Sequence, residues 1–177
     1  MRRPSPKFVQ ECLELLGLEE ANPVFTPGHK GLDESSSDVP LDQAEVALYR
    51  TVVGKLLYVS EEFPEYMFAV KECSRELREP TSGSFRRLKH LVRFLKGRAG
   101  VCTCFRPVES STIDVYVDSK WGNCKVTRKS SDCVLLMVHG CLLYASCKTH
   151  SFIAQSSGEA EMAAIHRGGL MGILRKN

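Results

Sequence analysis

The chain has 177 residues, 43% of them hydrophobic, and a net charge of +3 at pH 7. It contains no apolar run near the ~18 residues of a membrane-spanning helix, and its N-terminus lacks the apolar core and cleavage site of a secretory signal. This composition excludes a membrane-embedded protein and predicts a globular intracellular protein, cytoplasmic or nuclear, of one or two small domains.

Eight cysteines are scattered through the chain, mostly inside apolar patterns. They form no C-x-x-C motif and no paired Cys/His spacing, so the sequence does not favour structural zinc. We interpret them as reduced thiols of the hydrophobic core.

The small net charge hides an asymmetry along the chain. Residues 1–80 carry nine Lys/Arg against fifteen Asp/Glu, whereas residues 81–177 carry fifteen against six. A basic second half is typical of a polyanion-binding protein, although a solvated basic face gives the same pattern.

The first hundred residues show helical periodicity. A short amphipathic helix is predicted over 7–16, before a linker rich in Pro, Gly, Ser and acidic residues over about 21–41, with disorder expected at 35–40. Asp42 and Glu45 form a capping box that opens a helix to Val59. Pro64 begins the next helix, whose buried stripe extends to Leu77.

A further helix, Phe85–Lys96, is capped by Thr81 or Ser82 and has one apolar face and one basic face. Two interpretations of the basic face remain open: it is solvated on an ordinary core helix, or it contacts phosphates. The basic residues in question are Arg86, Arg87, Lys89, Arg93 and Lys96.

After Gly100 the periodicity becomes that of strands. Strands are predicted at 113–118, 132–139 and 141–146, with a turn at His139-Gly140, and they make an antiparallel meander. A helix from Gly158 to about Leu174 follows, in which Gly168 and Gly169 make the last turns doubtful. The fold class is therefore mixed α/β (α+β): a helical segment, then a meander and one helix.

Two carboxylates stand out in this second half. Asp118 ends the first predicted strand, and Glu161 lies in the first turns of the last helix. Carboxylates are the ligands that magnesium prefers, and paired metal ions activate water for phosphodiester hydrolysis. The alternatives are a solvent-facing Asp and an exposed Glu stabilised by the helix dipole. Glu159 completes a capping box with Ser156 and is assigned to helix initiation.

Several blocks, in order along nearly the whole chain, resemble the C-terminal part of the polyprotein of copia-type long-terminal-repeat retrotransposons. The blocks are Asn22-Pro-Val-Phe-Thr-Pro27, Tyr49-Arg-Thr-Val-Val-Gly-Lys-Leu-Leu-Tyr58, Ala69-Val-x-x-x-Ser74-Arg75, Leu88-Lys-His-Leu-Val-Arg-Phe-Leu-Lys-Gly97, Tyr116-Val-Asp118-Ser-Lys-Trp121, Arg128-Lys-Ser130 and Ser156-Ser-Gly-Glu-Ala-Glu161.

This resemblance implies a reverse transcriptase C-terminal or connection-like helical region over 1–107 and the N-terminal part of a ribonuclease H-like domain over 108–177. It implies that Asp118 and Glu161 are catalytic ligands of Mg²⁺ or Mn²⁺. It also implies two partners. One is an RNA–DNA hybrid, held by the basic helix Phe85–Lys96 together with Arg128 and Lys129, and the other is the rest of the Pol polyprotein.

The sequence departs from the family in two places near the proposed site. Lys120 replaces the second Asp of the family's Asp-Ala-Asp-Trp, and Tyr144 stands where the family usually has Trp. The polymerase aspartates and the third ribonuclease H carboxylate would lie outside the chain, so we expect it to be truncated at both ends. Whether it is an enzyme stays open.

Three hypotheses follow. The first is metal-dependent hydrolysis of RNA in RNA–DNA hybrids, the activity of the family. The second is a non-catalytic nucleic-acid-binding remnant, which strong salt dependence without metal dependence would identify. The third is an inert transposon relic that exposes a sheet edge and its core.

Overall fold

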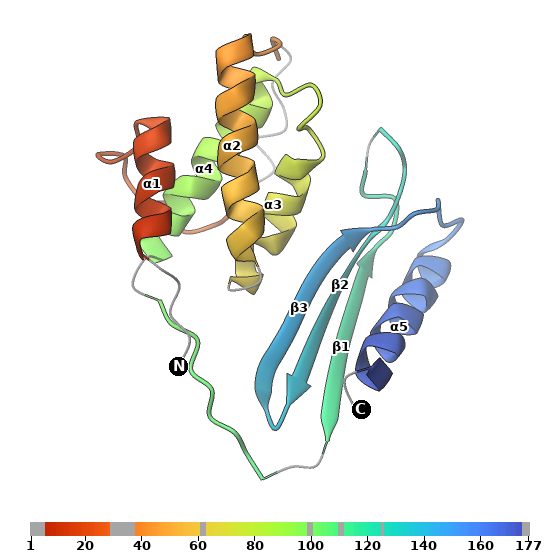
Figure 1. The fold of residues 1–177 in the computed structure, drawn as a ribbon. Helices are drawn as coiled ribbons and strands as arrows, with labels where there is room; N and C mark the ends of the chain where they lie inside the picture. The colour runs from red at the N-terminus through yellow and green to blue at the C-terminus, as the bar shows by residue number, and fades with distance from the viewer. Residues whose placement is uncertain are drawn as a thin grey trace. The chain divides into compact units, whose positions relative to one another are not determined.

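The computed structural model describes residues 6–28, 38–60, 63–98, 101–109, 112–124 and 126–174. The chain divides into two compact units, Met1–Thr103 and Cys104–Asn177. The first unit is helical, and the second contains the sheet (Figure 1).

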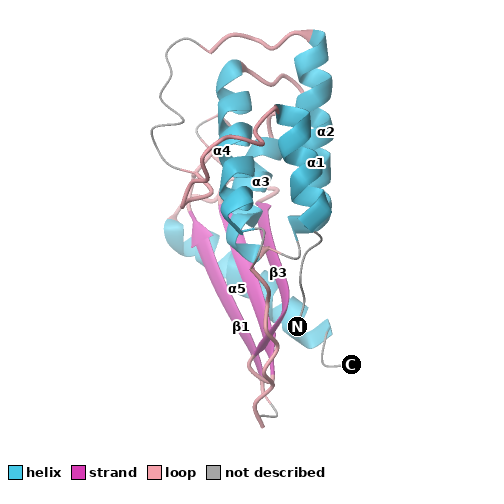
Figure 2. Ribbon diagram, turned by 90° about the vertical axis from the view of Figure 1, so that its left-hand side faces the viewer, coloured by secondary structure: helices cyan, strands magenta, loops and turns pink. Residues whose placement is uncertain are grey.

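The first unit consists of helices that pack around one apolar core. They are α1 (Pro6–Leu16), α2 (Gln43–Val59), the short 3₁₀ helix η3 (Pro64–Tyr66), α3 (Met67–Ser74) and α4 (Ser82–Arg98). Each of the long helices α2 and α4 places a stripe of apolar side chains in the core, as the 3.6-residue period predicts. Figure 2 shows these helices in cyan.

Local sequence fixes where these helices begin. Asp42 accepts a hydrogen bond from the backbone N–H of Glu45, and the Glu45 carboxylate accepts one from the Asp42 N–H, which confirms the predicted capping box. At the start of α4, the Thr81 hydroxyl accepts from the Ser84 N–H. Both caps satisfy backbone donors that a helix N-terminus leaves without partners.

The core of this unit contains a buried polar contact. The Tyr49 hydroxyl donates a hydrogen bond of 2.8 Å to the Cys73 carbonyl. Burial raises the pKa of the Cys73 thiol from 9.0 to about 12, and burial likewise raises the pKa of Tyr49 far above its usual value. Both groups are therefore held in their neutral forms.

Two details of the first unit differ from expectation. The helical segment predicted to begin at Pro64 ends at Ser74 rather than continuing to Leu77. Residues 38–41 are ordered against the start of α4, since Pro40 forms a β-bridge with Thr81. The rest of the segment expected to be disordered, 35–37, lies outside the described residues.

The second unit is the predicted meander with one helix. Strands β1 (Ile113–Lys120), β2 (Ser131–Val138) and β3 (Cys141–Thr149) form an antiparallel sheet in the order β1-β2-β3, and α5 (Ser157–Leu174) follows. The turn between β2 and β3 has positive φ at both His139 (50°) and Gly140 (71°), as a tight two-residue hairpin requires. The predicted fold class is confirmed.

Helix α5 lies along one face of the sheet (Figure 1). Its buried residues Ala160, Ala164 and Gly168 are small and spaced four apart, so the helix approaches the strands closely. A Cβ atom at Gly168 would lie 2.3 Å from Val117 Cγ1. Close packing against β1 therefore requires glycine at position 168, one of the two residues that weakened the prediction of the last helical turns. The helix nevertheless continues to Leu174.

None of the eight cysteines forms a disulfide, but only Cys12, Cys73 and Cys124 are buried. The interpretation of all eight as core thiols is therefore corrected: strands β2 and β3 carry three cysteines whose side chains are half-buried. Within the described ranges, no helix has both the length and the apolar character needed to cross a bilayer.

Candidate functional site

Asp118 lies on the face of the sheet that α5 does not cover. Burial alternates along β1: Ile113, Val115 and Val117 are half-buried, whereas Asp118 is exposed. The glycines of α5 contact Val115 and Val117. Because successive side chains of a strand point to opposite faces, the carboxylate of Asp118, one residue after Val117, points away from the helix. Lys120, the departure from the family motif, is also exposed and lies on the same face as Asp118.

Glu161 lies on α5, which covers the other face. It is exposed, whereas its neighbours Ala160 and Ala164 are buried against the sheet. Glu159 begins this helix: its carboxylate accepts a 2.6 Å hydrogen bond from the Gln155 N–H, while Ser156 Oγ accepts one from the Glu159 N–H. Its assignment to helix initiation is confirmed, but the Glu159 carboxylate accepts from the N–H of Gln155 rather than from that of Ser156, which the predicted capping box required.

These positions bear on the predicted magnesium site. The Asp118 side chain lies on the face of β1 that is turned away from α5, the helix that carries Glu161. Across the described part of the chain, no group of three or more His, Cys, Asp or Glu side chains could hold a metal ion. The residues present therefore do not fit the multi-carboxylate site that paired divalent ions need. The pairing of Asp118 with Glu161 stays a prediction.

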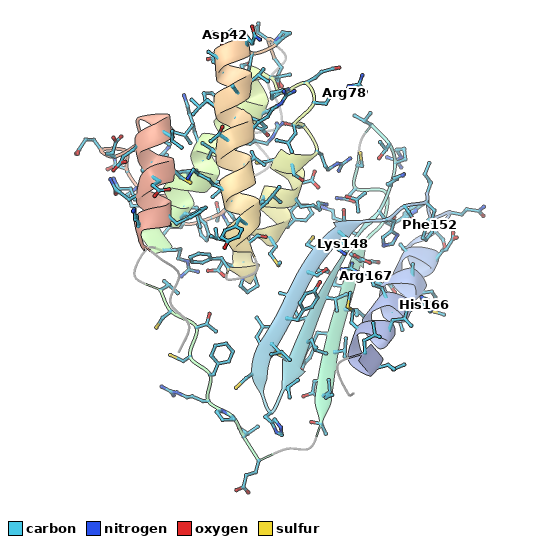
Figure 3. The ribbon with its side chains drawn as sticks, viewed as in Figure 1. Asp42, Arg78, Lys148, Phe152, His166 and Arg167 are labelled. Carbon is cyan, nitrogen blue, oxygen red and sulfur yellow. The ribbon has the colours of Figure 1, made fainter. Side chains whose placement is uncertain are left out.

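A buried charged network, which sequence reasoning missed, lies between α5 and the sheet. Asp132, at the start of β2, has a side chain only 4% exposed and forms an ion pair with Arg167 of α5. Arg167 also donates to the hydroxyl of Ser146 on β3. Figure 3 shows Arg167 on the side of α5 that faces the strands and His166 on the other side. The network ties the helix to two strands.

His150 completes this network at the end of β3. Its Nε2 atom lies 3.6 Å from Asp132 Oδ2, and its ring stacks on Phe152 with centroids 5.3 Å apart. Its side chain is 4% exposed, and neither ring nitrogen has a hydrogen-bond partner among the described residues. The buried Asp132 carboxylate thus lies between the Arg167 guanidinium and the His150 ring, and its ion pair with Arg167 ties α5 to β2.

A signal for this network is present in the sequence. Arg167 falls on the same helical face as Ala160, Ala164 and Gly168, the small residues that contact the sheet. A charged residue on a buried helical face requires a buried partner of opposite charge. The only acidic residue inside the second predicted strand is Asp132.

Two of the basic residues predicted to bind nucleic acid are paired with carboxylates. Arg86 forms an ion pair of 3.1 Å with Asp38, and Arg87 donates to both carboxylate oxygens of Glu76. These pairs fix the start of α4 to the segment before α2 and to the segment after α3. Their charges are compensated within the unit.

The other basic side chains of α4 bind groups that carry no charge. Arg93 donates to the Asn22 carbonyl at 2.7 Å, and Lys96 donates to the carbonyls of Glu19 and Ala21. Lys89 lies over the Phe85 ring, 4.6 Å from its centroid. The segment 19–26 is thus fastened to α4. Among the described residues, no carboxylate pairs with Lys89, Arg93 or Lys96.

Arg128 and Lys129 lie in the turn between β1 and β2. The Arg128 N–H donates to the Cys124 carbonyl at 2.8 Å, and the Cys124 N–H donates to the Lys129 carbonyl. Arg128 has φ of 56°, so the turn holds it in the left-handed region. Its side chain is exposed and that of Lys129 half-buried.

Other residues of the family-like blocks have structural contacts. Trp121 Nε1 donates a 2.8 Å hydrogen bond to the Ala154 carbonyl, which positions the segment that leads into α5. The buried Ser130 hydroxyl accepts from the Gly122 N–H, and the Ser130 carbonyl accepts from the His150 N–H. Through these hydrogen bonds, Trp121 and Ser130 fix the segment between β3 and α5 at His150 and at Ala154.

Comparisons with known proteins agree with these motifs. The chain is 27% identical over 162 residues to an uncharacterized mitochondrial protein of Arabidopsis thaliana, covering 90% of this chain and 65% of that protein. It is 29% identical over 165 residues to the retrovirus-related Pol polyprotein from transposon TNT 1-94 of Nicotiana tabacum, covering 89% of this chain and 12% of the polyprotein. It is 24% identical over 163 residues to that from transposon RE2 of Arabidopsis thaliana, covering 90% and 11%.

The chain therefore spans about two thirds of the mitochondrial relative and about a tenth of the polyproteins. No family model matches it, and no solved structure matches it. The similarities confirm the resemblance carried by the sequence motifs: the chain is related, over about 90% of its length, to retrovirus-related Pol polyproteins of plant transposons.

Proposed function

We propose that this chain is a segment of a retrotransposon Pol polyprotein that binds RNA–DNA hybrid without cleaving it. In this proposal residues 1–107 correspond to the C-terminal helical region of a reverse transcriptase, and residues 108–177 to the first part of a ribonuclease H-like domain. The observation that carries the proposal is similarity to two Pol polyproteins over about 90% of the chain, combined with the basic side chains Lys89, Arg93 and Lys96 of α4, for which the described residues provide no carboxylate partner.

The positive charge gathers on one stripe of α4. Lys89, Arg93 and Lys96 are spaced i, i+4 and i+7, so they share one side of the helix, and α4 contains no acidic residue. This α4 cationic stripe is available for phosphate contacts because its partners are carbonyls and a ring rather than carboxylates. In the second unit, Arg128 and Lys129 offer a further cationic site for phosphates.

The competing proposal is metal-dependent hydrolysis of the RNA strand, with Asp118 and Glu161 as ligands of Mg²⁺ or Mn²⁺. Bound metal would supply an activated water and a clamp on the phosphate. The described residues do not fit such a site, since Asp118 lies on the face away from α5 and no group of three ligands is formed among them. Hybrid binding without cleavage is therefore preferred.

The test is a binding titration with a labelled RNA–DNA hybrid at several salt concentrations, with and without Mg²⁺ or Mn²⁺. We expect binding that does not need metal and whose logarithm falls linearly with the logarithm of salt concentration, by about 0.7–0.9 per phosphate contacted. Lys89→Gln and Lys129→Gln should each reduce that slope by about one contact. Lys148→Gln, an exposed lysine outside the proposed sites, is the matched control and should not change it.

The same samples separate the alternatives. Metal-dependent shortening of the RNA strand that disappears in Asp118→Asn would refute the proposal and establish the nuclease activity of the family. A folded sample that retains no hybrid at low salt would refute both, and binding of a hydrophobic dye by that sample would identify an inert relic.

A further inference from the structure

Two half-buried cysteines face each other across neighbouring strands of the second unit. Cys133 of β2 and Cys147 of β3 are direct Cα partners in the antiparallel register. Their sulfur atoms lie 3.0 Å apart, and the two residues are not joined by a disulfide. The two sulfurs are therefore already in contact in the reduced protein.

This geometry is compatible with a disulfide. Facing residues of antiparallel strands have Cα atoms about 4.5–5.5 Å apart, inside the ~4.4–6.8 Å range of disulfide-linked cysteines. An S–S bond of ~2.05 Å requires the two sulfurs to approach by only about 1 Å, which small χ1 rotations supply without moving the backbone. The strands hold the pair in place, so little chain entropy is lost when the bond forms.

We propose that Cys133 and Cys147 are a reversible redox pair that closes to a cross-strand disulfide. With glutathione disulfide as oxidant, the thiolate of one cysteine attacks a glutathione sulfur, forms a mixed disulfide and releases one glutathione thiolate. The second thiolate then attacks the sulfur of the first cysteine and releases the second glutathione. The two thiols lose two protons and two electrons, and glutathione disulfide is reduced to two glutathione molecules.

The bond would change the open face of the sheet. Cys133 is also the Cα partner of Asp118 on β1, so Asp118, Cys133 and Cys147 form one row across three strands. Oxidation closes a covalent ring that contains the turn at His139 and Gly140, and it fixes β2 to β3 beside the exposed carboxylate. Redox state thereby controls the stiffness of the sheet face that α5 leaves uncovered.

The pair is tested by thiol counting and mapping on the complete chain. After incubation with glutathione disulfide and removal of the reagent, the free thiols measured in denaturant should fall from eight to six. Remaining thiols are blocked before digestion. Because residues 130–148 contain three cysteines but no internal Lys or Arg, trypsin leaves them on one peptide, so chymotrypsin, which cuts at the intervening Leu and Tyr residues, is used.

The expected product is a pair of chymotryptic peptides joined through Cys133 and Cys147, released by dithiothreitol. Cys133→Ser should leave glutathione on Cys147 and form no ring, while the control Cys141→Ser, on the same strand as Cys147, should still lose two thiols. A count that stays at eight in folded protein, a bond mapped to any other pair, or a disulfide between two chains on a non-reducing gel would overturn the proposal.

Discussion

Two adjacent glycines in α5 should respond in opposite directions when replaced by alanine. Gly168 is buried, and its added methyl group would lie 2.3 Å from Val117 Cγ1 and 3.2 Å from Val115 Cγ1. Gly169 is exposed, with no atom of another residue within 4 Å of its added Cβ. The same substitution one residue apart therefore separates packing from helix propensity.

The magnitudes follow from these distances. Alanine in a helix interior is favoured over glycine by about 1 kcal/mol, and Gly169→Ala gains this amount because nothing opposes it. At Gly168 the same gain is outweighed by overpacking that costs about 1–3 kcal/mol, and the β-branched Val117 has few rotamers with which to move aside. We expect Gly168→Ala to lower the free energy of unfolding of the second unit by about 1 kcal/mol, so the two variants differ by about 2 kcal/mol.

Urea denaturation followed by tryptophan fluorescence measures this difference. Trp121 is the only tryptophan of the chain and belongs to the second unit, and its Nε1 atom donates to the Ala154 carbonyl next to α5. Its signal therefore reports on the unit that contains both glycines. If both variants moved the midpoint in the same direction, α5 would not pack against Val117 as described, and the placement of this helix would be refuted.

Three further predictions concern the same framework. Arg167→Met removes the arginine that pairs with the buried Asp132 carboxylate and should destabilise the second unit by about 3–5 kcal/mol. The double variant with Asp132→Asn should recover a large part of this loss, and both are measured from the midpoint of the tryptophan fluorescence transition. The unfolded Cys73 thiol ionises above pH 9, but the folded thiol stays protonated to about pH 12. The unfolded state then binds fewer protons, so the helical unit should lose stability as pH rises above 9, measured by circular dichroism in urea. Asp42→Ala removes the cap of α2 and should cost about 1 kcal/mol in the same circular dichroism assay, while Asp42→Ser should restore most of it.

Local sequence signals predicted the elements of this fold well because each signal has a local cause. The capping box at Asp42, the turn at His139-Gly140 and the alternation of β1 all act within a few residues. The end of α3 before Leu77 was missed, because the chain leaves the helix at Arg75 although the apolar spacing continues. A helical spacing alone does not reveal where tertiary contacts end a helix.

The candidate site was harder to predict because its geometry depends on distant residues. Sequence identified the basic character of α4 but not its partners, which include carbonyls of Asn22 and Ala21 about seventy residues earlier in the chain. It did not reveal that Asp132 and Arg167 pair beneath α5, since that contact joins a strand to a helix. The number of charged residues can be counted in a sequence, but whether each charge lies beside an opposite charge is known only from the folded structure.

The face on which Asp118 lies is determined by the packing of α5 rather than by Asp118 itself. A shift of β1 by one residue would turn Asp118 toward the helix, because successive side chains alternate between faces. The same shift would place Tyr116 against Gly168, where even a methyl group is too close to the sheet.

Since β1 lies at one edge of the three-stranded sheet, a metal shared by Asp118 and Glu161 would have to sit at that edge, open to water. Mn²⁺ bound there would keep several waters and bind weakly. A shared ion would broaden backbone amide signals at the edge of β1, and the broadening would weaken equally in Asp118→Asn and Glu161→Gln. Because Asp118 lies on the face that α5 does not cover, we expect Mn²⁺ to cause no broadening that depends on both carboxylates. Broadening centred on the buried residues between α5 and the sheet would contradict this placement of the strand.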